Sequence, residues 1–183
     1  EPLSSFYKPY VSDSVRFKSL LLNSGFSFEK MRVVEDYILS EKPDVVHCHL
    51  NVIPFLYRLI IKKLGIKFYH TVHSVAKVAA GISVQYPIDK YLYKKKLLIP
   101  VTITHECLDT FLKYYKLNDV KCIYNGCEQL RPSESYETVV AEVNAYKFSS
   151  NTKVFIHVAR CNPIKNQELL VDAFNQMYAE GYD

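Results

Sequence analysis

The sequence predicts an α/β fold with a doubly wound parallel sheet. Apolar runs typical of buried strands begin near residues 44, 67, 99, 120 and 154, and segments with helical spacing lie between them. Strands and helices that alternate in this way form parallel sheets, because each crossover helix returns the chain to the same edge. The composition, 49% hydrophobic and 23% charged, is that of an ordinary globular protein and excludes a disordered chain.

The first elements follow from apolar spacing and from helix stop signals. A helix is predicted over residues 28–40 and ends before Pro43. A unit of strand, helix and strand follows over residues 44–71. Pro54 suits the first turn of its helix, and Gly65 suits the carboxyl-terminal cap.

A second unit of strand, helix and strand is predicted over residues 99–123. Its helix begins near Glu106, and Thr104 is the candidate N-cap, because a hydroxyl can accept from a free amide of the first turn. Asn125 and Gly126 predict a turn after the last strand, since both residues tolerate a positive φ.

The last predicted unit, residues 152–177, consists of a buried strand, a loop with two cations and an amphipathic helix. Arg160 and Lys165 lie in the loop, beside the amino terminus of the helix. Open α/β sheets bind phosphorylated ligands at this position, because free amides and the helix dipole favour anions. The loop predicts an anion site, although a solvated cationic loop explains these two residues equally well.

Five segments, in matching order, resemble motifs of retaining glycosyltransferase family 4 (group 1), whose members have the GT-B fold. The segments are PDVVHCH (43–49), KFYHTVHS (67–74), VTITHE (101–106), VKCIYNG (120–126) and ARCNPIKN (159–166). The last segment departs from the family's Lys-Gly pattern, because Asn166 replaces the glycine. The resemblance implies two Rossmann-like domains, one on the acceptor side and one that binds the nucleotide sugar.

On this resemblance, we expect residues 1–127 to form the N-terminal acceptor-side domain and residues 128–150 to cross between domains. Residues 151–183 would begin the C-terminal domain. A complete two-domain enzyme needs about twice this length. We therefore expect a fragment that is incomplete at both ends and inactive alone, and its open strand edge would favour a self-paired dimer.

The resemblance also implies a reaction and its site residues. The parent enzyme would transfer a sugar from a UDP- or GDP-linked donor to a saccharide or lipid-linked hydroxyl acceptor, in polysaccharide or glycolipid synthesis. Arg160 and Lys165 would hold the donor diphosphate, where fixed positive charge stabilises the leaving group. Asn125 and Gly126 would lie near the cleft, although a plain turn also explains them.

Histidines lie near the ends of two neighbouring predicted strands. The resemblance makes His73 catalytic, since an imidazole there can donate a hydrogen bond or stabilise charge, and makes His49 an acceptor-side candidate. His47, His70 and His157 are expected in or beside the sheet. No Asp-x-Asp motif occurs, and His70 and His73 would point to different faces, so we expect neither a metal nor another cofactor.

Two other functions remain compatible with the sequence. A nucleotide-sugar 2-epimerase of the same fold would need carboxylates in its cleft. A non-catalytic sugar-binding or assembly module is favoured if the natural chain has this length.

Charge and cysteine content bear on partners and location. The net charge of +4 is scattered, which argues against a nucleic-acid partner. The run over residues 91–98 mixes aromatic residues with lysines and could contact an anionic membrane surface, or it could be the exposed side of a helix. Five cysteines without Cys-x-x-Cys spacing predict free thiols in the cytoplasm, and membrane contact by residues 91–98 would place the protein at the inner membrane face.

Overall fold

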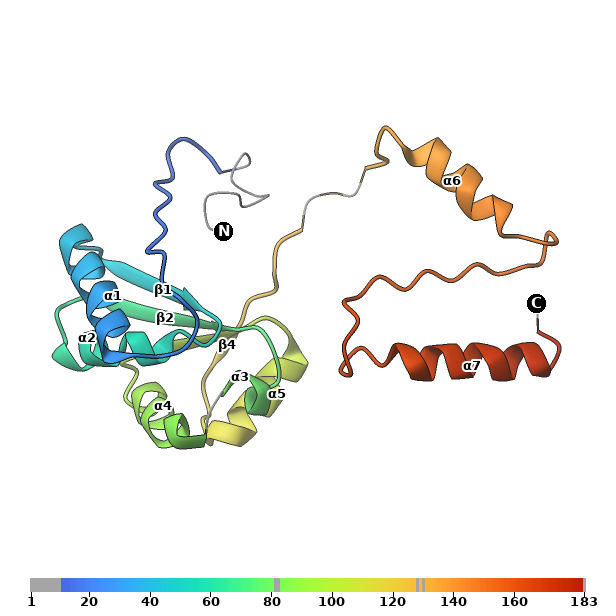
Figure 1. Cartoon of the computed structure of the whole chain (residues 1–183). Helices are drawn as coiled ribbons and strands as arrows, with labels where there is room; N and C mark the ends of the chain where they lie inside the picture. The colour runs from blue at the N-terminus through green and yellow to red at the C-terminus, as the bar shows by residue number, and fades with distance from the viewer. Residues whose placement is uncertain (1–10, 81–82, 128, 130, 183) are drawn as a thin grey trace. The chain divides into compact units, whose positions relative to one another are not determined.

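The computed structural model describes residues 11–80, 83–127, 129 and 131–182. The chain divides into two compact units, Glu1–Gly126 and Cys127–Asp183 (Figure 1). Residues 1–10, 81–82, 128, 130 and 183 of the predicted domains lie outside the described part.

The N-terminal unit is built on a parallel sheet whose strands follow the order of the sequence. Within the described residues the strands are β1 (Val45–His49), β2 (Lys67–Val72), β3 (Ile99–Thr102) and β4 (Lys121–Cys122). Each strand pairs in parallel with the next, which confirms the predicted α/β fold. Since all of the strands run the same way, their carboxyl ends lie along one edge of the sheet.

Helices connect the strands in the predicted alternation. The helical elements of this unit are α1 (Phe28–Glu41), η2 (Ile53–Phe55), α2 (Tyr57–Lys62), α3 (Ala76–Ala79), η3 (Ser83–Gln85), α4 (Tyr86–Lys94) and α5 (His105–Tyr115). The helices predicted over 28–40 and from Glu106 are confirmed, whereas α3 was not foreseen. The run over residues 91–98 begins in α4, and its three lysines are exposed while Leu92 and Tyr93 are buried.

Local capping fixes the ends of the two longest helices of this unit. The Ser27 side chain accepts from the Lys30 amide at 3.2 Å, and Thr104 Oγ1 accepts from the Cys107 amide at 3.1 Å, as predicted for Thr104. Both helices end at a residue in the left-handed region, where the backbone leaves the helix.

The core lies between one face of the sheet and the helices. It is formed by side chains of the strands, of η2 and α2, of α4 and of α5, including Cys48, Phe68, Val72, Leu56, Leu59, Ile60, Leu92, Tyr93, Phe111 and Tyr115. Alternate strand residues point to opposite faces, so Val45, His47 and Tyr69 lie on the other face. That face lines the cavity described below.

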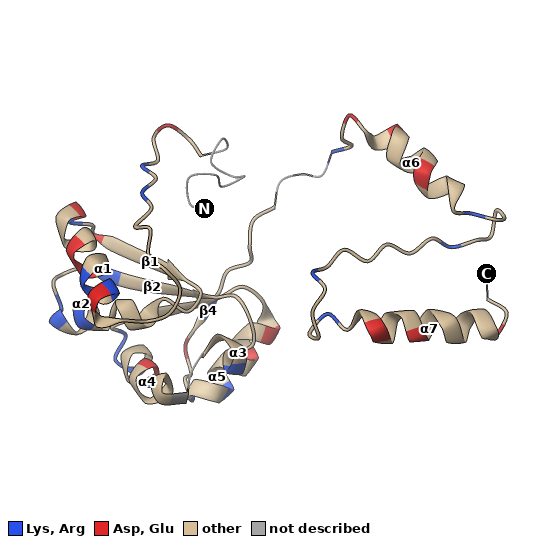
Figure 2. Cartoon of the chain, in the orientation of Figure 1, with Lys and Arg blue, Asp and Glu red and all other residues tan. Residues whose placement is uncertain are grey.

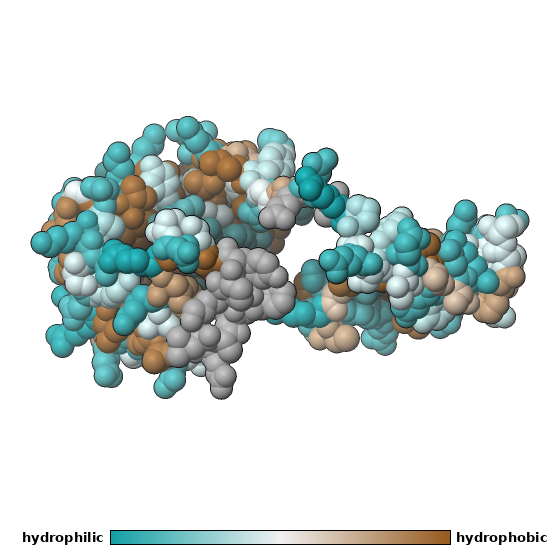
Figure 3. All heavy atoms as spheres, turned by 90° about the horizontal axis from the view of Figure 1, so that it is seen from above, coloured by the Kyte–Doolittle hydropathy of each residue, from teal (hydrophilic) through white to brown (hydrophobic). Residues whose placement is uncertain are grey.

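The C-terminal unit contains α6 (Tyr136–Ala145) and α7 (Gln167–Ala179). Both helices match predicted apolar patterns, but neither has a buried residue. Apolar side chains of α6, α7 and the segment between them line an open cavity of about 1140 Å³. In Figure 3, apolar and polar side chains are mixed on the visible surface of this unit.

The predicted buried strand in this unit is wrong. Residues 152–160 form no strand, and Ile156 and Val158 are 70% and 90% exposed. A strand needs a neighbour to receive its hydrogen bonds, and no other strand is found among the described residues of this unit. His157, expected in or beside the sheet, is therefore exposed.

The predicted turn at Asn125 and Gly126 is also wrong. Neither residue has a positive φ, and the described chain from residue 123 to residue 127 forms no turn.

Candidate functional site

The carboxyl edge of the sheet brings two of the predicted site residues together. His49 ends β1, and His73 directly follows β2. His49 pairs in register with Thr71, which places His73 two residues further along the same face. Nδ1 of His49 lies 2.9 Å from Nε2 of His73, within hydrogen-bonding distance.

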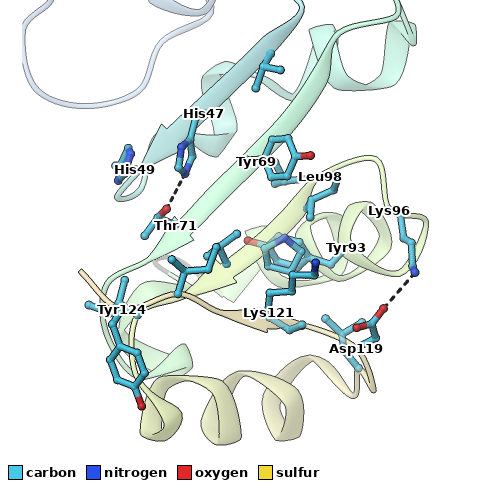
Figure 4. Close-up of a pocket in the computed structure, with 18 of the residues that line it drawn as sticks. His47, His49, Tyr69, Thr71, Tyr93, Lys96, Leu98, Asp119, Lys121 and Tyr124 are labelled. Atoms are coloured by element: carbon cyan, nitrogen blue, oxygen red, sulfur yellow. Dashed lines mark hydrogen bonds and ion pairs between the residues drawn. The ribbon is translucent and has the colours of Figure 1, made fainter. Parts of the chain in front are cut away.

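His47 supports this pair from the preceding position on the same face of β1. Its ring packs against that of His49, with centroids 4.5 Å apart, and its Nε2 lies 2.7 Å from Thr71 Oγ1 (Figure 4). Burial lowers the pKa of His47, and the neighbouring His49 and His73 lower it further. A lowered pKa favours the neutral imidazole.

His70 points to the opposite face, as predicted, and is buried in the core. Nε2 of His70 lies 3.1 Å from the Leu50 carbonyl, and its Nδ1 lies 2.8 Å from the Tyr93 hydroxyl. Since a carbonyl can only accept, Nε2 carries the proton and Nδ1 accepts from Tyr93. Burial lowers the pKa of His70 to about 4, so this histidine is a neutral structural residue.

A cavity of about 1200 Å³ lies against the face of the sheet that carries His47, His49 and Tyr69, opposite the core. Its walls contain residues of all four strands, among them His47, His49, Thr71 and, from β4, the cationic Lys121, and Asn125 and Gly126 line it as well. Figure 4 shows His47 and His49 near the carboxyl end of β1. The ion pair between Lys96 and Asp119, with its N and O atoms 3.4 Å apart, lies away from them. The cavity therefore joins His49 to two further predicted site residues.

Arg160 and Lys165 lie in the C-terminal unit, in the loop that precedes α7. The Arg160 carbonyl accepts from Gln167 Nε2 at 2.9 Å, and the Lys165 amide donates to the Asn162 carbonyl at 3.0 Å. Both cationic side chains are exposed. Figure 2 shows basic residues in this loop, whereas the charged residues of α7 itself are acidic.

Asn166 preserves the loop conformation that a glycine would favour. Its φ is 48°, in the left-handed region, and it directly precedes the first residue of α7. Glycine and asparagine are the residues that adopt this region most readily. The replacement of glycine noted in the sequence is therefore compatible with the loop.

Thr71 and Tyr93 are polar partners of His47 and His70 that the sequence analysis did not identify. Thr71 could have been found from its position two residues before His73, which places both on one face of a strand. Tyr93 offered no such signal, because it reaches His70 from α4.

Metal binding, thiol reactivity and membrane spanning are three further properties of the described residues. In the described ranges, no group of three or more His, Cys, Asp or Glu residues is arranged to hold a metal ion. The cysteines there are free, and burial raises the pKa of Cys48 to about 12, which disfavours its reactive thiolate. No helix in the described chain is long and apolar enough to cross a membrane.

Comparison with known proteins identifies the family. The model of Glycosyltransferase Family 4 matches residues 6–129, more than half of the chain. No curated protein and no solved structure gives a significant match. The matched range includes the whole parallel sheet and the histidine pair at its carboxyl edge, and the chain belongs to glycosyltransferase family 4, a family of transferases.

Proposed function

We propose that this chain supplies the acceptor-side domain of an enzyme that transfers a sugar from a nucleotide-diphosphate donor to a hydroxyl acceptor. The supporting observation is the contact between His49 and His73 at the carboxyl edge of a parallel sheet, in a member of a sugar-transferring family. Ligands of open α/β folds bind outside this edge. His73 is the proposed catalytic residue, and His49, Asn125 and Gly126 form part of the cleft.

The chemistry requires charge stabilisation on both sides of the bond that breaks. The bond between the anomeric carbon and the phosphate oxygen is cleaved, so positive charge develops on the sugar and negative charge on the diphosphate. A hydrogen bond from a substrate hydroxyl to the His73 imidazole orients the sugar at this step. As the new glycosidic bond forms, the proton of the acceptor hydroxyl passes to an oxygen of the departing diphosphate.

Arg160 and Lys165 are the proposed ligands of the leaving diphosphate. The guanidinium of Arg160 matches two phosphate oxygens, while Lys165 supplies a compact charge. Free amides at the start of α7 add further donors. The proposed donor is linked to UDP or GDP, and the proposed setting is polysaccharide or glycolipid synthesis on the cytoplasmic side of a membrane.

The test is a transfer assay with the protein at its natural length, UDP- and GDP-sugars as donors and saccharide acceptors. His73→Ala should lower kcat by about 10² or more, as expected for loss of a group that acts on the reacting centre. Lys113→Ala is the control, because Lys113 is exposed on α5. If His73→Ala retained wild-type activity, His73 would have no catalytic role.

The donor site is tested separately by titration of UDP and GDP. Lys165→Ala and Arg160→Ala should each weaken nucleotide binding by about tenfold or more, because a charge-assisted hydrogen bond is lost. Lys153→Ala is the matched control, since Lys153 is an exposed cation of the same unit. Equal affinity in all three variants would refute the diphosphate site.

A further inference from the structure

We propose that His49 is a positioning residue that fixes the ring orientation and the tautomer of His73, so that Nδ1 of His73 is the nitrogen presented to the substrate. This inference rests on the proposed catalytic role of His73. It follows from the contact between Nδ1 of His49 and Nε2 of His73, which lie 2.9 Å apart.

Backbone pairing and ring packing hold His49 in place. Its backbone belongs to β1, where it pairs with Thr71 of β2. Its ring packs against His47, whose Nε2 contacts the hydroxyl of the buried Thr71 at 2.7 Å. A ring that is held by its strand and by packing against a hydrogen-bonded neighbour can hold the next ring in one orientation.

The contact also limits where the protons can be. A neutral imidazole carries its proton on one nitrogen and accepts at the other. One of the two facing nitrogens must therefore donate and the other must accept. If both rings carry the proton on Nε2, the tautomer that free histidine favours, His73 donates to Nδ1 of His49 and both rings keep their preferred form.

This arrangement leaves Nδ1 of His73 with a free lone pair. It can accept a hydrogen bond from a sugar hydroxyl and so fix the sugar relative to the bond that breaks. Without His49, the His73 ring can turn by half a turn about its Cβ–Cγ bond, which puts a carbon where Nδ1 was, and it can adopt either tautomer. Only part of the bound enzyme would then be in the productive arrangement, and small errors of position are costly in rate.

The experiment compares His49→Leu with His49→Asn in the protein at its natural length. Leucine removes the contact, while the asparagine amide can occupy the position of Nδ1. We expect His49→Leu to lower kcat about tenfold with KM for the donor unchanged, and His49→Asn to recover most of the loss. His157→Leu is the control, because His157 is exposed in the other unit.

A spectroscopic measurement tests the positioning without any assay of activity. In ¹⁵N NMR spectra of the histidine rings, His73 should show a single Nε2-protonated tautomer in the wild type and a mixture in His49→Leu. An unchanged His73 spectrum, or an unchanged kcat in His49→Leu, would overturn the inference. If the tautomer shifts but the wild-type protein transfers no sugar, the positioning stands and the proposed function fails.

Discussion

Replacement of the buried Asp89 should make the stability of the N-terminal unit fall more steeply at low pH than that of the wild type. Asp89 lies in α4 and is 2% exposed, and its Oδ1 accepts from the Tyr57 hydroxyl at 2.6 Å. Burial raises the pKa of Asp89 from 3.8 to about 6, although the Tyr57 hydrogen bond lowers it in part. His70, also buried, has the opposite shift, from 6.5 to about 4.

The two shifts act on stability with opposite signs. Below pH 6.5 the unfolded chain protonates His70 while the folded chain does not, so stability is lost as the pH falls towards 4. Below pH 6 the folded chain protonates Asp89 more readily than the unfolded chain, so stability is gained as the pH falls towards 3.8. At roughly 1.4 kcal/mol for each tenfold change in proton affinity, each contribution amounts to about 3 kcal/mol.

In the wild type these contributions nearly cancel between pH 7 and pH 4. Tyr93, Tyr115 and Cys48 also interact with Asp89, but their pKa values are raised and they stay neutral in this range. Asp89→Asn keeps an acceptor for Tyr57 and removes only the gain at low pH. The variant should therefore lose about 3 kcal/mol more stability than the wild type between pH 7 and pH 4.

The measurement is urea unfolding at pH 7, 5.5 and 4, followed by the near-ultraviolet signal of the buried tyrosines. Asp109→Asn is the control, because Asp109 is an exposed carboxylate on α5. If the free energy of unfolding changed with pH in the same way in Asp89→Asn and in the wild type, the opposite contributions of Asp89 and His70 would be refuted.

Three further predictions concern packing, capping and the loop before α7. Leu59→Ala, at a fully buried position, should lower the free energy of unfolding in urea by about 2–5 kcal/mol. Ile61→Ala, at a 58% exposed position, should lower it by less than about 1 kcal/mol, and equal losses would contradict the assigned core. In the same urea assay, Thr104→Ala should lower the free energy of unfolding by about 1 kcal/mol. Thr104→Ser should lower it much less, because only the alanine removes the hydroxyl that caps α5. Asn166→Gly should preserve the hydrogen-exchange protection of α7, and Asn166→Val should reduce it, since valine disfavours a φ of 48°. Equal protection in the two variants would exclude the left-handed conformation at residue 166.

Much of the N-terminal unit could be predicted because its signals are local. Apolar spacing identified α1 and α5, and the hydroxyl of Thr104 marked the start of α5, because a cap depends only on residues within one turn. The alternation of strands and helices predicted the parallel sheet. The different directions of His70 and His73 followed from the period of two along a strand.

The failures occurred where the structure depends on distant partners. Residues 153–158 have the composition of a strand, yet composition cannot provide a neighbouring strand, and the segment forms no strand. Asn125 and Gly126 permit a turn but do not require one. A turn forms only where the chain reverses, which the elements on either side decide.

The sequence by itself determined the family, the alternation of strands and helices in the sheet of the N-terminal unit, and a face of β1 that carries both His47 and His49. Only the tertiary structure decided that His49 meets His73, because this contact depends on the register between β1 and β2. A shift of one residue would turn the two side chains to opposite faces. Register is fixed by the packing of the whole sheet against α2, α4 and α5, which no short segment of the sequence contains.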